Sequence, residues 1–306
     1  MNQKENFGKI ILIAGATGNL GGRIINALLE RGAEVRAIVR SSCDVNKIKE
    51  LEARGVKVFK INMSGTEELT TACNGVSCVV SALTGMRDVI IDKQKLLLDA
   101  AVAAGVPRFI PSDYSLDFTK FSDGENRNLD WRREFHKILD RSSISATTIF
   151  NGAFAELITG QMPLILFKKK LVLYWGNADH KMGFTTIDNT AAFSANAALD
   201  PSTPRFLRIA VDEISPREIK KVVTEVTGQK YCLFRAGGPG VLSMFIKIGR
   251  TLSPGKTNIY PAWQGMQYMR NMIDVRADID KLDNDRYHDI HWTTIKDVLT
   301  AYYDKK

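Results

Sequence analysis

The chain has 306 residues, of which 44% are hydrophobic and 25% are charged, and its net charge is +8. This composition excludes a disordered chain, and the apolar runs are too short to span a membrane. The basic residues are scattered, so we expect no nucleic-acid partner. With four unpaired-looking cysteines and no apolar leader, we expect a cytoplasmic protein with reduced thiols.

The first half of the chain alternates predicted strands and helices. Short apolar or β-branched runs predict strands at about 9–14, 34–39, 56–61, 78–82, 108–111 and 145–150. Apolar residues at helical spacing predict helices at about 20–31, 45–54, 67–73, 89–104 and 129–141. Strands joined by crossover helices predict a doubly wound α/β fold, in which a parallel sheet has helices on both faces.

From about Gly152 onward the alternation stops, and the pattern predicts a smaller α+β lobe. Ser215, Pro216 and Glu218 form a strong helix start, with a capping hydroxyl, a first-turn proline and a capping-box carboxylate. Strands are predicted at 171–175 and 205–210, and helices at 190–199 and 241–252. We expect a nucleotide-binding domain of residues 1–153, completed by about 184–230, and an interleaved substrate lobe of about 154–183 and 231–306.

A glycine-rich loop follows the first predicted strand and opens the first predicted helix. It consists of Gly15, Ala16, Thr17, Gly18, Asn19, Leu20 and Gly21. A pyrophosphate binds backbone N–H groups at a helix N-terminus, where side chains would block its approach. We therefore predict that this loop binds a dinucleotide; a glycine turn without a ligand is the alternative.

The end of the second predicted strand indicates which dinucleotide is bound. An NAD site places a carboxylate there for the ribose hydroxyl, whereas an NADP site places a cation for the 2′-phosphate. Here the strand ends in Arg40, Ser41 and Ser42, and the first acid is Asp44. This order favours NADP (NADPH), with Arg40 and Ser41 at the phosphate; a solvated surface arginine is the alternative.

Six parts of the sequence together form a recognisable pattern: residues 11–21, Arg40, residues 108–114, residues 151–154, residues 184–190 and residues 292–298. This pattern resembles the NmrA-like and isoflavone-reductase-like group of atypical short-chain dehydrogenases. The resemblance implies a Rossmann fold and an NADP cofactor, in a group that contains both reductases and NADP-sensing regulators. It also implies that Ser81, Ala82, Leu83 and Thr84 line the cofactor, and that Pro111 and Ser112 lie near the nicotinamide.

The usual Tyr-x-x-x-Lys pair of short-chain dehydrogenases does not occur at the expected place, because Phe118 stands four residues after Tyr114. Reductases of the resembled group place a lysine on the helix before the sixth strand, and counting back assigns that position to Arg132. Arginine stays charged and is a poor proton donor. His136 or Lys137, one helical turn further along, and Tyr114 are therefore the alternative donors, and a surface or packing role is the alternative for His136.

Two functions are compatible with these features. The first is an NADPH-dependent reductase of a small aromatic, quinone-like or enone-like substrate, for which Phe154, Trp175, Tyr260, Trp263 and Tyr268 could form an apolar wall. The second is an NADP(H)-binding redox sensor that acts through a protein partner. We favour the enzyme. We expect no metal site, because His288 and His291 lack a third ligand.

Overall fold

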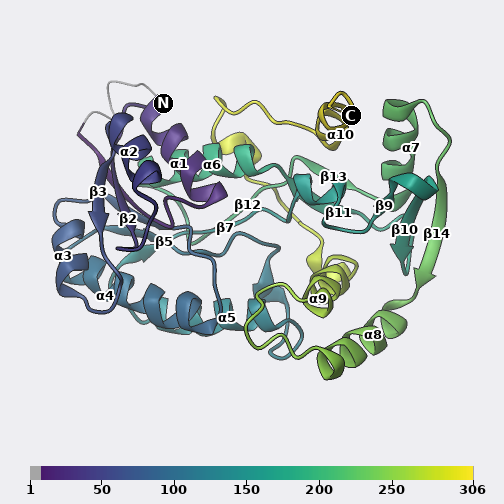
Figure 1. Ribbon diagram of the computed structural model, residues 1–306, viewed down its shortest axis with the longest axis horizontal. Helices are drawn as coiled ribbons and strands as arrows, with labels where there is room; N and C mark the ends of the chain where they lie inside the picture. The colour runs from purple at the N-terminus through teal and green to yellow at the C-terminus, as the bar shows by residue number, and fades with distance from the viewer. Residues whose placement is uncertain (1–7, 306) are drawn as a thin grey trace.

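The centre of the protein is a six-stranded parallel sheet. The computed structural model describes residues 8–305. The sheet occupies the left half of Figure 1. The strand order is β3-β2-β1-β4-β5-β6. The strands are β1 (Ile10–Ala14), β2 (Glu34–Val39), β3 (Lys57–Lys60), β4 (Cys78–Ser81), β5 (Arg108–Ile110) and β6 (Ser145–Ala146). This order, which reverses between β1 and β4, is that of a Rossmann fold and confirms the predicted fold class.

Helices cover both faces of the sheet, as predicted. One face packs against α1 (Asn19–Glu30), α2 (Val45–Ala53) and α6 (Ile187–Leu199), and the other against α3 (Glu67–Cys73), α4 (Gln94–Ala103) and α5 (Arg127–Leu139). Because side chains alternate along a strand, Ile11 and Ile13 of β1 pack on the first face, whereas Leu12 and Ala14 pack on the second. The sheet is therefore buried on both sides.

Two predicted elements differ from the structure. The strand expected at 145–150 is divided into β6 and β7 (Thr148–Phe150), and β7 pairs in parallel with β12 (Phe206–Arg208). The N–H of Thr147 still donates to Phe109 of β5, but the N–H of Thr148 donates to Arg205. The helix expected at 89–104 begins as a π-helical turn, Asp88–Lys93, before α4.

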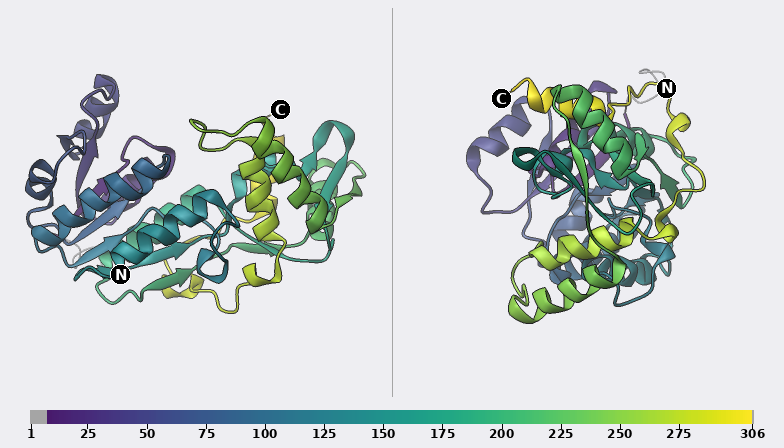
Figure 2. Two further views of the ribbon diagram at one scale, coloured as in Figure 1. Left: turned by 90° about the horizontal axis from the view of Figure 1, so that it is seen from below. Right: turned by 90° about the vertical axis from the view of Figure 1, so that its right-hand side faces the viewer.

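The rest of the chain packs around a separate apolar cluster. Its strands are β8 (Ala153–Phe154), β9 (Ile165–Leu166), β10 (Leu171–Trp175), β11 (Met182–Thr185), β13 (Asp212–Ile214) and β14 (Cys232–Gly237), and its helices are α7 (Pro216–Thr227), α8 (Pro239–Leu252), α9 (Ala262–Met272) and α10 (Ile295–Tyr303). The predicted capping box at Ser215 is present. The right-hand view of Figure 2 shows α8 and α9 side by side along its lower edge. Among residues 8–305, every helix is too short or too polar to traverse a bilayer.

Candidate cofactor and substrate site

The predicted phosphate loop forms a tight turn between β1 and α1. The N–H of Gly18 donates to the carbonyl oxygen of Gly15 over 3.0 Å, and Gly18 is the N-cap of α1. No side chain among residues 8–305 caps this helix, and Thr17, Gly18 and Asn19 are exposed. The N–H groups of the first turn are therefore free to bind an anion, and the helix dipole favours one there.

Two glycines of the loop are required by close packing. Gly15 has a φ of +86°, and a Cβ at this position would overlap the backbone carbonyl of Ala82. A Cβ at Gly21 would overlap the carbonyl group of Gly15. Gly15 therefore lets the loop lie directly on the segment after β4, and Gly21 lets the first turn of α1 lie directly on the loop, as a dinucleotide site requires.

The adenosine end of the predicted site lies after β2. Arg40 and Ser41 are exposed, and within residues 8–305 Arg40 has no carboxylate partner. Asp44 is used elsewhere, because its side chain caps α2 by accepting the N–H of Asn46 over 2.8 Å. The N–H of Ser41 donates to Oδ1 of Asn62 over 2.9 Å, a contact that fixes this loop and that the sequence did not predict.

The carboxyl ends of β4 and β5 meet at the same edge of the sheet. Ser81 is fully buried, and within residues 8–305 its hydroxyl oxygen has no hydrogen-bond partner. The hydroxyl of Ser112, which follows Pro111, donates to the carbonyl oxygen of Leu83 over 2.5 Å. The N–H of Ser112 donates to Oε1 of Gln94 over 2.9 Å, a further contact that sequence reasoning missed. At this edge, hydrogen bonds thus fix the backbone around Ser112, while the buried hydroxyl of Ser81 lacks a partner within residues 8–305.

Arg132 extends from α5 to this edge. Its Nε donates to the carbonyl oxygen of Ser112 over 3.1 Å, and its Nη1 donates to that of Asn128 over 2.9 Å. The side chain is largely buried, and the half-buried Tyr268 of α9 lies close to it. Burial raises the pKa of the Tyr268 phenol, and the Arg132 guanidinium opposes that shift. Arg132 therefore lies at the junction of the sheet edge and α9.

The two predicted proton donors are placed less favourably. His136 is 6% exposed and packs between Phe118 and Phe206, with Nε2 on the carboxylate of Asp113. Tyr114 packs on the α1 and α6 side of the sheet, and burial of its hydroxyl raises its pKa. A proton donor must reach the substrate within hydrogen-bond distance. Both placements therefore favour packing roles over the predicted donor roles.

Of the five rings predicted to form an apolar wall for the substrate, not all are free to contact one. Trp263 is 3% exposed, its indole N–H donates to the carbonyl oxygen of Ser253, and the Arg127 guanidinium covers its ring. Phe154, Trp175 and Tyr268 are half-buried, and Tyr260 is exposed. Trp263 is therefore structural, and the other four rings remain candidates for substrate contact.

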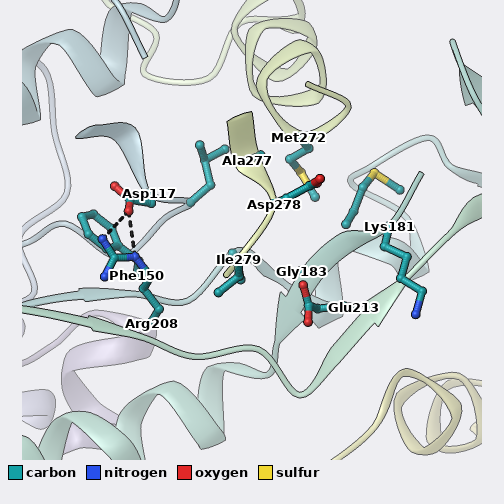
Figure 3. A pocket seen from close by; sticks show the side chains of 13 residues that line it. Asp117, Phe150, Lys181, Gly183, Arg208, Glu213, Met272, Ala277, Asp278 and Ile279 are labelled. Atoms are coloured by element: carbon teal, nitrogen blue, oxygen red, sulfur yellow. Dashed lines mark hydrogen bonds and ion pairs between the residues drawn. The ribbon is translucent and has the colours of Figure 1, made fainter. Parts of the chain in front are cut away.

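A small cavity opens between β7 and the segment after α9. Figure 3 shows Arg208 bound to Asp117 beside the ring of Phe150, with Asp278 and Lys181 further along the wall. Its volume of about 20 Å³ holds little more than a water molecule, and none of the predicted cofactor residues lines it. It is therefore separate from the candidate site. No cluster of three His, Cys, Asp or Glu suited to a metal occurs in residues 8–305.

Comparisons with known proteins agree with the predicted resemblance and fold. The sequence matches the NmrA-like family over residues 8–290. Pinoresinol reductase 2 of Arabidopsis thaliana is 29% identical over 217 residues, which are 66% of this chain and 68% of the relative. The bifunctional pinoresinol-lariciresinol reductase of Linum album is 24% identical over 316 residues, with 98% and 96% covered. The solved structure of AtPrR2 with NADP+ and (+)pinoresinol has a TM-score of 0.81 at 22% identity, covering 96% of this chain and 98% of that one.

Proposed function

Because the chain belongs to the NmrA-like family, we propose that it is an NADPH-dependent reductase of a small aromatic compound. The relatives named above are reductases, and one was solved with NADP+, which supports the class of NADP-dependent oxidoreductase. The relatives named above carry reductase names, which favours the enzyme over the regulator. The substrate class rests on the pinoresinol named for the relatives and on the half-buried rings of this chain.

The residues at the glycine loop and the strand ends fit an NADP cofactor. The first turn of α1 would hold the pyrophosphate, Arg40 the 2′-phosphate, and the edge around Ser81 and Ser112 the nicotinamide. The bound cofactor supplies a hydride to an electrophilic carbon of the substrate. The buried, unpaired hydroxyl of Ser81 is an observation of this structure that favours a polar ligand at this edge.

The observation that carries the proposal is the position of Arg132. Two of its nitrogens are fixed by the carbonyl oxygens of Ser112 and Asn128, while Nη2 has no hydrogen-bond partner among residues 8–305. A fixed guanidinium stabilises the negative charge that develops on a substrate oxygen when an adjacent conjugated carbon accepts hydride. Because arginine stays protonated, this role is electrostatic, and water or another group must deliver the proton.

The test is NADPH oxidation with a panel that includes pinoresinol, an isoflavone, a quinone and an enone. We expect turnover with at least one aromatic member, and we expect Arg132→Met to lower kcat roughly a hundredfold because a fixed charge is lost. The Kd for NADPH, followed by fluorescence, should change less than about threefold. Tight NADPH binding without oxidation by any substrate would contradict the proposal, and equal kcat values would remove the role of Arg132.

A further inference from the structure

A buried polar cluster fastens α5 to the segment that follows β5. The imidazole Nε2 of His136 donates to Oδ2 of Asp113 over 2.5 Å, and the hydroxyl of Thr148 donates to the same oxygen over 3.0 Å. Asp113 and Thr148 are 0% exposed. A carboxylate buried this deeply is costly unless it is paired, so these contacts hold the three side chains, and the elements that carry them, together.

Two aromatic rings pack against the imidazole of His136, which is 6% exposed. The ring centroids of Phe118 and Phe206 lie 4.9 and 6.2 Å from that of the imidazole. The Arg205 guanidinium also contacts the cluster, because its Nη1 donates to the Thr148 hydroxyl over 2.8 Å. His136 is therefore enclosed by aromatic rings and by its hydrogen-bond partners, a position suited to fixing α5 against the segment after β5.

The cluster and Arg132 bind two consecutive residues. Arg132 and His136 are four residues apart on α5 and so share one face of the helix. Arg132 binds the backbone carbonyl of Ser112, and His136 binds the side chain of Asp113. The hydroxyl of Ser112 in turn holds the carbonyl oxygen of Leu83. A shift of α5 would therefore move the Arg132 guanidinium relative to the edge where the nicotinamide is proposed to lie.

We propose that Asp113, His136 and Thr148 form a clamp that positions Arg132, and that His136 is a positioning residue for the reductase. The expected loss of kcat rests on the proposed function, whereas the expected loosening of the segment after β5 does not. Misplacing a catalytic group by about 1 Å can cost roughly a hundredfold in rate. Loss of the clamp should therefore reduce kcat while leaving the phosphate loop, and with it NADPH affinity, nearly unchanged.

The kinetic test compares three substitutions of His136. We expect His136→Ala to lower kcat roughly tenfold or more, with the KM for NADPH changed less than about threefold. His136→Gln should recover most of the activity, because its amide nitrogen takes the place of Nε2, whereas the shorter His136→Asn should not. Leu139→Ala is the matched control, because it removes a buried side chain from the same helix without touching the clamp. An equal loss of kcat in the control would overturn the proposal.

Hydrogen exchange of the full chain, without substrate, gives a second measurement. The N–H of Ser112 donates to Oε1 of Gln94 and that of Asp113 to the carbonyl oxygen of Pro111, so we expect both to exchange slowly in the wild type. Exchange over residues 111–116 should be about tenfold faster in His136→Ala and His136→Asn, but not in His136→Gln. Unchanged exchange in His136→Ala would overturn the clamp. The two proposals can fail separately. If the wild type turns over no substrate but the three variants differ in exchange as expected, the proposed function is wrong and the clamp is supported.

Discussion

Arg40 is exposed after β2 and is the residue on which cofactor choice should depend. A guanidinium attracts the 2′-phosphate of NADPH, whereas a carboxylate repels it and accepts hydrogen bonds from the ribose hydroxyls of NADH. We expect Arg40→Asp to weaken NADPH binding at least about tenfold and to reverse the preference between the two cofactors. Fluorescence titration with each cofactor measures this.

The control for Arg40 is Lys47→Asp, which makes the same change in charge at an exposed position on α2. We expect NADPH affinity to change only slightly there, because exposed charges at a distance are screened by salt. If both substitutions weakened NADPH equally, the effect would come from overall charge, and Arg40 would lose its assigned role.

Single residues differ in how well the sequence locates them. The family resemblance, together with a count back from the sixth strand, assigns the catalytic position to Arg132, and the structure brings that side chain to the carbonyl oxygen of Ser112. Gln94, Asn62 and Asp113 were missed as parts of the site, because their contacts join segments that are 18 to 23 residues apart. No local motif records such contacts; they arise only when helices and loops pack against the sheet edge.

The packing of α1 on the loop after β1 can be tested with two adjacent glycines. A Cβ at Gly21 would overlap the carbonyl group of Gly15, whereas at Gly22 the nearest atom, the carbonyl oxygen of Ala16, would lie 3.6 Å away. We expect Gly21→Ala to destabilise the protein by about 1–3 kcal/mol, because α1 must shift. Gly22→Ala should stabilise it by up to about 1 kcal/mol, through the higher helix propensity of alanine.

Urea unfolding of the two glycine variants gives both free energies, and NADPH titration adds a functional reading. Gly21→Ala should also weaken NADPH binding, because the shift of α1 moves the N–H groups of its first turn. Equal stabilities for the two variants would show that α1 tolerates the displacement and that close packing at Gly21 is unimportant.

Elements were predicted well where their pattern is periodic and less well where they change partners. The five leading strands, β1 to β5, and their parallel arrangement follow from short apolar runs joined by crossover helices, whereas their order comes from the structure. The apolar run at 145–150 could not reveal that its two halves pair with different strands, because both halves are equally suitable for a sheet. The π-helical turn at Asp88–Lys93 has the same composition as a regular helix, so periodicity did not distinguish it.

In the molecule as a whole, the end of α6 is tied to a segment far along the chain. Oδ2 of Asp200 accepts hydrogen bonds from Nη2 of Arg286 over 2.7 Å and from the hydroxyl of Tyr287 over 2.9 Å, and its Oδ1 accepts one from Ser202. Burial acts to raise the pKa of Asp200, but these hydrogen bonds outweigh it and lower the pKa from 3.8 to about 2.

This lowered pKa makes the stability of the whole molecule depend on pH through Asp200. Because the folded pKa lies below the unfolded one, the contribution is complete above about pH 4 and is lost as pH falls towards 2. We expect Asp200→Asn to lower the unfolding free energy by about 1–2 kcal/mol at neutral pH, allowing for solvent screening. In urea unfolding, this difference should shrink by about pH 3.

The surface control Asp99→Asn, which loses only an exposed pair with Lys95, should change stability by less than about 0.5 kcal/mol. A difference for Asp200→Asn that stayed constant over this range would show that shape, and not charge, joins the two segments.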